Sequence, residues 1–150
     1  LLANGAEKVY AVDVGYGQLD WKLRQDRRVV VKEKTNARFL TNQIIKDPPD
    51  AIVCDVSFIS LKKVLPSGLK LLKNNGWLAA LIKPQFEVGK GLVGKGGVVR
   101  NSELHKEVKN DIKNWLQFEM KMNLLGIVDS PILGPSGNKE FMIVATKLLN

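Results

Sequence analysis

The chain alternates between short apolar runs and longer amphipathic stretches. The apolar runs are rich in β-branched residues, which is typical of strands that are covered on both faces of a sheet. They predict strands at residues 9–14, 29–32, 51–56, 77–83, 124–128 and 141–146. Each is too short to cross a lipid bilayer, and no signal-peptide pattern opens the sequence.

Helices are predicted between these strands, at residues 18–24, 36–45, 61–73 and 102–121. The last is the clearest, because Ser102 can cap its start and Leu104, Val108 and Ile112 lie on one apolar stripe. Residues 48–49 and 74–76 contain the proline and glycine signals that break the chain before two strands. Strands that alternate with helices predict one α/β domain over residues 1–150, with a doubly wound and mostly parallel sheet.

Tryptophan and histidine add little to this picture. Trp21, Trp77 and Trp115 fall inside predicted elements, so we expect them to cover the sheet and not to stack on nucleobases. His105 falls on the polar side of the long helix, without a nearby cluster of Cys, Asp or Glu, so a metal site is not expected.

Three charged residues stand where a predicted strand meets a loop, namely Asp55, Lys83 and Glu140. In an open α/β sheet, ligands bind at the carboxyl ends of the parallel strands. If strands 51–56 and 77–83 are parallel neighbours, Asp55 and Lys83 meet at that edge. An antiparallel strand at 141–146 would begin at the same edge and bring Glu140 there. The sequence therefore predicts a functional site that contains these three side chains.

The charge balance is 23 Lys and Arg against 15 Asp and Glu, a formal net charge of +8. Such an excess favours a polyanionic partner, RNA, DNA or an anionic membrane surface, although a surplus of solubilising lysines explains it equally well. Cys54 is the only cysteine, so an internal disulfide is excluded and the expected compartment is the reducing cytosol.

A glycine-rich segment follows Lys83. Residues 89–94 match the dinucleotide-binding pattern GxGxxG, and residues 89–95 match the start of a P-loop, but Gly96 stands where a P-loop requires Ser or Thr. The segment also does not run directly from a strand into a helix. We expect a mobile loop over the sheet edge, in which Lys90, Lys95 and Arg100 contact a phosphate backbone. A merely flexible surface loop is the alternative.

A second glycine pattern, Asp13-Val-Gly15-Tyr-Gly17, follows the first predicted strand. A strand that leads into DxGxG and a helix looks like the cofactor loop of class I methyltransferases. Alternatively, this is a second strand whose terminal acid binds the ribose hydroxyls of a nucleoside cofactor. A tight structural turn is the third interpretation, and the local pattern leaves all three open.

Several motifs together resemble the TlyA/hemolysin A family, whose members are similar to FtsJ-type methyltransferases. They lie at residues 11–19, 35–38, 55–60, 83–91 and 134–138, so the resemblance covers essentially the whole chain. It implies a Rossmann-like class I methyltransferase sheet with an antiparallel C-terminal strand. It also implies methyl transfer from S-adenosylmethionine to a ribose 2′-hydroxyl of ribosomal RNA, in the cytoplasm.

The resemblance also implies roles for single residues. The family's catalytic set is Lys-Asp-Lys-Glu, and its last three members match Asp55, Lys83 and Glu140. The first lysine would precede Leu1, as would the glycine-rich cofactor loop, the strand leading into it and a small S4-type RNA-binding domain. The alignment gives a cofactor set in which Asp13 is the ribose-binding acid, together with Gly15, Glu33 and Asp55.

The proposed chemistry requires such residues. A ribose 2′-hydroxyl is a poor nucleophile, and its proton must leave as the oxygen attacks the sulfonium methyl group. A lysine accepts that proton only when neutral, which burial and nearby positive charge favour and carboxylates oppose. We expect Asp55 and Glu140 to orient Lys83, and Asp55 also to help place the cofactor. The alternative is that Lys83 forms only a surface salt bridge with either acid, which would contribute little to stability.

Two other function classes stay open. A non-enzymatic RNA-binding module is favoured by the net charge and by the missing cofactor loop. A membrane-active, hemolysin-like protein is suggested by the family name, but no basic amphipathic helix with a large exposed apolar face supports it, and stable membrane insertion is not expected. The expected partner is ribosomal RNA or a ribosomal subunit.

The missing strand has a physical consequence. In the family's sheet it would be central, between the strands at 9–14 and 51–56. Without it, two strand edges are left unpaired inside the fold. We therefore expect residues 1–150 to belong to a longer protein, and the isolated chain to be unstable or inactive.

Overall fold

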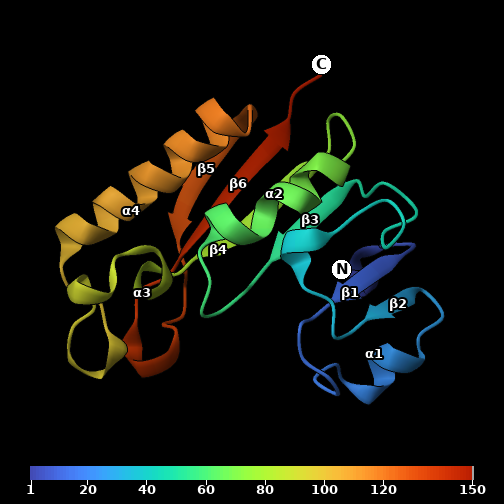
Figure 1. The fold of residues 1–150 in the computed structure, drawn as a ribbon, viewed down its shortest axis with the longest axis horizontal. Coiled ribbons are helices and arrows are strands. Elements are labelled where there is room, and N and C mark those ends of the chain that lie inside the picture. The colour runs from blue at the N-terminus through green and yellow to red at the C-terminus, as the bar shows by residue number, and fades with distance from the viewer. Residues whose placement is uncertain (150) are drawn as a thin grey trace.

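The computed structural model describes residues 1–149, apart from the side chain of Lys90, and distributes their strands between two sheets (Figure 1). In the smaller sheet, β1 (Val9–Val12) pairs in parallel with β2 (Val29–Lys32). In the larger sheet the strand order is β3 (Ala51–Cys54), β4 (Trp77–Ile82), β6 (Phe141–Lys147) and β5 (Met122–Asp129). Strands β3 and β4 are parallel, whereas β6 is antiparallel to both of its neighbours. The expected antiparallel C-terminal strand is confirmed.

Short helices connect the strands. The α-helices are α1 (Trp21–Gln25), α2 (Leu61–Leu71), α3 (Pro84–Glu87) and α4 (Ser102–Asn114), and α4 continues as a π-helical turn, η5 (Trp115–Glu119). Single 3₁₀ turns lie at η1 (Leu2–Asn4), η2 (Ala37–Phe39), η3 (Lys90–Leu92), η4 (Lys95–Gly97) and η6 (Pro135–Gly137). Within residues 1–149, every helix is too short or too polar to cross a membrane.

The hydrophobic core lies on one face of the larger sheet, beneath α2 and α4 (Figure 1). Alternate residues of β4 and β6 point into this core, because successive side chains of a strand project to opposite faces. On the other face, Val53, Trp77 and Val128 are exposed. Among the described residues, helices thus cover only one face of the larger sheet.

A cavity of about 900 Å³ separates β1 from β3. Its walls include Val12 of β1, Cys54 of β3 and Leu65 of α2. Strand β1 pairs only with β2, and β3 only with β4, so the edges that face this cavity have no strand partner in residues 1–149. The two unpaired edges expected from the sequence are therefore present.

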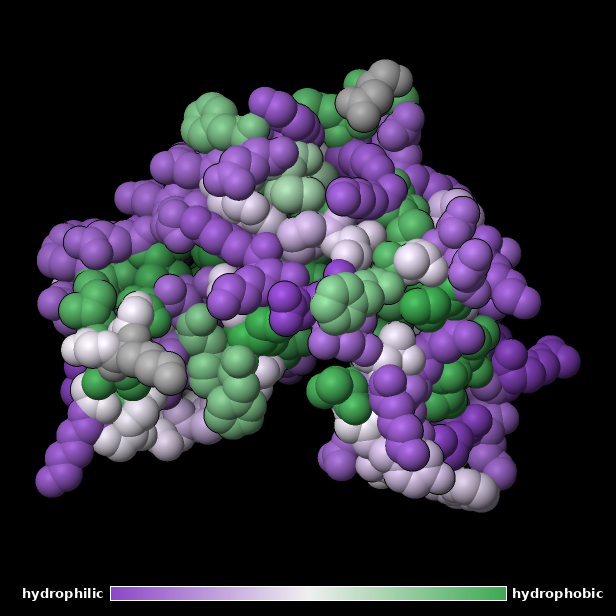
Figure 2. All heavy atoms as spheres, in the orientation of Figure 1, coloured by the Kyte–Doolittle hydropathy of each residue, from purple (hydrophilic) through white to green (hydrophobic). Residues whose placement is uncertain are grey.

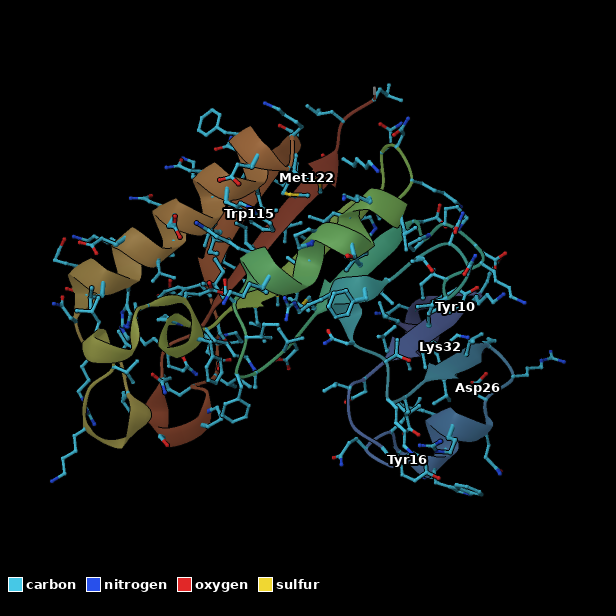
Figure 3. The ribbon with its side chains drawn as sticks, in the orientation of Figure 1. Tyr10, Tyr16, Asp26, Lys32, Trp115 and Met122 are labelled. Atoms are coloured by element: carbon cyan, nitrogen blue, oxygen red, sulfur yellow. The ribbon has the colours of Figure 1, made fainter. Side chains whose placement is uncertain are left out.

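A few side-chain contacts connect the smaller lobe, built around β1 and β2, with the larger lobe, built around the four-stranded sheet. The hydroxyl of Tyr10, labelled in Figure 3, donates to Oδ2 of Asp47 at 2.8 Å. Lys8 forms an ion pair with the same carboxylate at 2.5 Å. The turn η2 packs against α2, where the hydroxyl of Ser67 donates to the carbonyl of Arg38. The relative position of the sheets therefore depends on these contacts and not on strand pairing.

The structure corrects several helix boundaries. The helix predicted at 36–45 is wrong, since only η2 forms there, capped by the side chain of Asn36, and Phe39 is exposed. Helix α1 begins later than predicted, because the side chain of Asp20 accepts from the amide of Lys22. The N-cap of α4 is Asn101 and not Ser102.

Two expectations about aromatic side chains are also wrong. Trp21 is 67% exposed on the short helix α1, whereas Trp115 is buried near Met122 as expected (Figure 3). His105, expected on the polar side of its helix, is buried instead. Its Nε2 donates to the carbonyl of Val99 at 2.7 Å, and its ring packs edge-on against Phe141. A hydrogen bond to the backbone explains how this polar ring is accommodated.

We predict that residues 1–150, produced in isolation, do not unfold cooperatively. An apolar sheet face and two unpaired strand edges are open to water, which favours local opening and association through the edges. Thermal melting followed by circular dichroism, with light scattering to detect association, tests this. A sharp, reversible melt together with measurable methyl transfer by this chain alone would refute it.

Candidate active site

The predicted contact between Asp55 and Lys83 is present at the carboxyl ends of β3 and β4. Nζ of Lys83 lies 2.6 Å from Oδ1 of Asp55 and donates to the hydroxyl of Ser57 at 3.2 Å. The side chain of Lys83 is 10% exposed, and that of Asp55 is 68% exposed. A lysine this well buried is not one partner of an ordinary surface salt bridge, which was the alternative interpretation.

Glu140 lies beside Lys83 because of the strand register. Ile82 of β4 pairs with Phe141 of β6, so the antiparallel register places the next residues, Lys83 and Glu140, opposite each other. Directly opposed residues in such a pair have Cβ atoms about 4.5–5.5 Å apart. Glu140 is buried, and its Oε1 has no hydrogen-bond partner among the described residues. Since a buried carboxylate oxygen without a partner is costly, it is an acceptor available to a donor that enters the site.

A tight turn over residues 134–138 positions Glu140. The side chain of Asn138 is buried, and its amide donates to the carbonyl of Pro135 at 3.1 Å and to that of Gly97 at 3.0 Å. Its Oδ1 accepts from the amide of Val99 at 3.0 Å. Asn138 therefore holds the turn together and also fastens the end of the glycine-rich loop to it.

The turn leaves no room for a side chain at Gly134. A Cβ atom there would lie 2.6 Å from Cδ of Glu140 and would overlap Oε1. The φ of Gly134 is −75°, which any residue adopts, so a side chain here would displace the Glu140 carboxylate and would not strain the backbone.

The glycine-rich loop after Lys83 contains the two turns η3 and η4. It does not connect a strand directly to a helix, because α3 lies between β4 and the loop. Neither the dinucleotide-binding motif nor the P-loop is therefore formed. Its last part is fixed by Asn138, which limits the mobility expected for this loop. Lys95 and Arg100 are exposed, and the side chain of Lys90 lies outside the described part of the chain. Contact of these three residues with RNA stays a prediction.

The end of β1 carries the predicted ribose-binding acid. Asp13 is exposed, and its Oδ1 accepts from the amide of Gly15 at 2.7 Å. The carbonyls of Asp13 and Gly15 accept from the amides of Thr35 and Lys34, each at 3.0 Å. The loop after β1 is thereby fixed to the loop after β2, and Oδ2 of Asp13 makes no hydrogen bond to the described residues.

Glu33 is engaged within the protein. Its Oε1 accepts from the amide of Gly17 at 2.8 Å and from the guanidinium of Arg24, which holds the pKa of the Glu33 carboxyl below its usual range. Glu33 therefore ties the loop after β1 to α1, a role that the sequence did not suggest. A direct contact of Glu33 with the cofactor stays a prediction.

These elements surround a hollow between the two lobes, visible in Figure 2. Asp55 and Val12, the residue before Asp13, line the same cavity from opposite sides. Tyr16 lies at the far end of the smaller lobe (Figure 3). This cavity runs along the length of β1 and β3, where the family resemblance implies a further strand. Asp13 and Asp55 follow the carboxyl ends of β1 and β3, where ligands of open α/β sheets bind.

Sequence reasoning did not single out three residues near Lys83. Ser57 contacts Nζ of Lys83. Phe58 is 90% exposed, adopts a φ of +64° and packs its ring 5.1 Å from that of Phe86. Glu87 binds the start of α2. All lie within motifs 55–60 and 83–91, but their contacts require the two loops to be placed side by side. Burial also raises the pKa of the neighbouring Cys54 thiol to about 12, so this cysteine is unreactive.

A mixed sheet that ends in an antiparallel strand is the fold of a class I methyltransferase, and in this chain an acid, a buried lysine and a second acid lie at one edge of it. The sequence matches the FtsJ-like methyltransferases over residues 1–147, and the chain belongs to that family.

Similar proteins carry the names that the sequence motifs suggested. The 16S/23S rRNA (cytidine-2′-O)-methyltransferase TlyA of Mycobacterium tuberculosis is 48% identical over 143 residues, which are 95% of this chain and 53% of that protein. Hemolysin A of Brachyspira hyodysenteriae is 42% identical over 95% of this chain and 59% of its own length. The solved structure of a "putative hemolysin" from Streptococcus thermophilus superposes with a TM-score of 0.92 at 42% identity, covering 98% of this chain and 53% of that one. The chain thus spans little more than half the length of the relatives that it matches.

We predict that Gly134→Ala displaces the carboxylate of Glu140 and lowers the methyl-transfer rate by about 100-fold, a loss of the size that follows a 1 Å misplacement in an active site. Gly89→Ala is the matched control, because a Cβ at Gly89 meets nothing within 4 Å. Initial rates of methyl incorporation would be compared at equal folded fraction. Equal rates for the two variants would contradict the role assigned to Gly134.

Proposed function

We propose that the protein containing this chain is an S-adenosylmethionine-dependent methyltransferase that modifies a ribose 2′-hydroxyl of ribosomal RNA. The observation that carries the proposal is the buried Nζ of Lys83, held by Asp55 and lying opposite Glu140. The names of the TlyA relatives support the substrate, and ribosomal RNA as substrate implies a cytoplasmic reaction on RNA or a ribosomal subunit.

The residues at the hollow fit the nucleoside part of S-adenosylmethionine. Asp13 offers a free Oδ2 to the ribose hydroxyls, while its Oδ1 holds Gly15 in place. Asp55 lies on the other side of the cavity, where it contacts Lys83 and also lines the hollow. When bound, this cofactor supplies an electrophilic methyl group on a sulfonium. Asp13, Gly15 and Asp55 are the residues assigned to hold it.

The acid-lysine-acid set then acts on the RNA hydroxyl. Lys83, in its neutral form, would accept the proton of the 2′-hydroxyl as the oxygen forms its bond to the methyl carbon. The bond from that carbon to sulfur would break at the same time, so that a neutral thioether leaves. Asp55 and Ser57 fix the direction of Nζ. The free Oε1 of Glu140 accepts a hydrogen bond from Lys83 or from the 2′-hydroxyl, which orients the nucleophile.

The surface around the site suits a nucleic acid. Lys90, Lys95 and Arg100 are assigned to the phosphate backbone, because basic side chains supply most of the affinity for RNA backbones. The exposed ring of Phe58 offers a stacking surface next to Lys83, and unstacked bases in RNA commonly pack on such rings.

We predict that Lys83→Ala lowers methyl transfer to ribosomal subunits by at least about 100-fold, as expected for loss of a general base. Transfer would be measured with methyl-labelled S-adenosylmethionine, followed by nuclease digestion and mass spectrometry for a 2′-O-methylated nucleoside. Lys106→Ala, which removes an exposed lysine paired with Glu103, is the control. Full activity of Lys83→Ala would show that Lys83 is not the general base. RNA binding by a wild-type protein that transfers no methyl group would favour a non-enzymatic RNA-binding module.

We predict that Asp13→Asn weakens S-adenosylmethionine binding by at least about tenfold, since a hydrogen bond to a charged group contributes about 1.5–3 kcal/mol. The asparagine keeps the oxygen that accepts from Gly15, so the loop is preserved. Calorimetric titration provides the dissociation constant, with Asp111→Asn on α4 as a charge-matched control. Unchanged affinity in Asp13→Asn would show that another residue binds the ribose.

A further inference from the structure

Two loop segments run side by side at the candidate active site and are joined at three places. The first, residues 55–60, follows β3 and leads into α2, and the second, residues 83–87, follows β4 and forms α3. At one end Lys83 contacts Asp55 and Ser57. In the middle the rings of Phe58 and Phe86 are 5.1 Å apart.

Glu87 makes the third connection. Its Oε2 accepts from the hydroxyl of Ser60 at 2.6 Å, and its Oε1 accepts from the amide of Leu61 at 2.8 Å. The carboxylate is only partly exposed, and it occupies the amino end of α2, where free backbone amides favour an anion. Both of its oxygens are used within the protein, so Glu87 has none left for a ligand.

The contact of Glu87 with Ser60 and the contact of Lys83 with Asp55 lie at opposite ends of the two segments. Residues 55 and 83 are in contact at one end of the two segments, and residues 60 and 87 are in contact at the other. The loop between them is not held by its own backbone preference, because Phe58 adopts a positive φ that non-glycine residues rarely take. Asp55 is largely exposed, so no packing holds its side chain against Lys83. The hydrogen bonds of Glu87 to Ser60 and Leu61 therefore limit how the segment of residues 55–60 can move.

The position of the Glu87 carboxyl opposes its ionisation. Burial raises the pKa of the Glu87 carboxyl, despite the hydrogen bonds that oppose the shift. A carboxyl whose pKa is raised in the folded state binds its proton more tightly there than in the unfolded chain. Its ionisation therefore lowers stability as the pH rises through the interval between the two pKa values.

We propose that Glu87 is a positioning residue, which holds the loop 55–60 against α3 and thereby keeps Asp55 and Ser57 on Nζ of Lys83. The consequence for catalysis depends on the proposed function, whereas the consequence for Lys83 depends on the geometry alone. Glu87 itself does not touch the reacting atoms.

The test compares Glu87→Ala with Glu87→Gln in the full native protein. The alanine removes both hydrogen bonds and is expected to lower kcat by about 10- to 100-fold, while the KM for S-adenosylmethionine is unchanged. The glutamine can accept from Leu61 and donate to the hydroxyl of Ser60, so it is expected to restore most of kcat. Equal loss in both variants would overturn the proposal, because the charge and not the tether would then matter.

Lys147→Met is the matched structural control. Nζ of Lys147 donates to the carbonyls of Leu69, Lys70 and Leu72 at 3.1, 3.4 and 2.7 Å, at the opposite end of the same helix α2. Its loss weakens α2 without touching the loop 55–60. We expect this variant to lower the melting temperature but to keep kcat when assayed well below it. A loss of kcat as large as that of Glu87→Ala would mean that Glu87 acts only through helix stability.

A second readout does not require methyl transfer. The rate at which Lys83 is acetylated by acetic anhydride, measured by mass spectrometry as a function of pH, reports how its amine is held. We expect the profile to shift in Glu87→Ala, and to match wild type in Glu87→Gln and Lys147→Met. If wild-type protein transfers no methyl group but the shift is observed, the proposed function fails and the positioning role stands. An unchanged profile in Glu87→Ala would overturn the positioning role.

Discussion

The pairing of β4 with strands on both sides is the constraint on which the site depends. Leu78, Ala80 and Ile82 of this strand are fully buried against α2 and α4. A slip of one residue would move these side chains to the open face of the sheet, so the register is strongly specified. The same register fixes Lys83 one residue beyond the core, with Asp55 on the parallel side and Glu140 on the antiparallel side. Hydrophobic burial thus brings together three charges that come from distant parts of the sequence.

The immediate surroundings of Lys83 are made by loops, and loops are held here by buried polar side chains. Asn138 satisfies its amide with three backbone groups, and Glu87 satisfies its carboxylate with a hydroxyl and an amide. Hydrogen bonds are directional, so such contacts fix a turn more narrowly than apolar packing does. The sheet supplies the coarse position of each functional group, and these two residues supply the fine adjustment.

The strand pattern could be predicted from the sequence because the core strands are short, apolar and β-branched. Charges at strand ends then located Asp55, Lys83 and Glu140. The helix expected at 36–45 was wrong because local propensity is a weak guide that tertiary contacts override. His105 was expected on the polar side of its helix but is buried, because its ring donates a hydrogen bond to the carbonyl of Val99. That partner lies outside the helix and could not be read from the helical pattern. The contacts that Glu33 and Glu87 make within the protein were not predictable, because each depends on a partner in another segment of the chain.

The candidate site is divided between two lobes of unequal rigidity. Asp55, Lys83 and Glu140 lie on the larger lobe, where a continuous core fixes them, whereas Asp13 lies on the two-stranded lobe. The contacts that join the lobes include the exposed pair of Lys8 and Asp47, and exposed ion pairs contribute only about 0–1 kcal/mol. The distance between Asp13 and Lys83 is therefore the least constrained part of this geometry. Whatever occupies the cavity between β1 and β3 will set that distance.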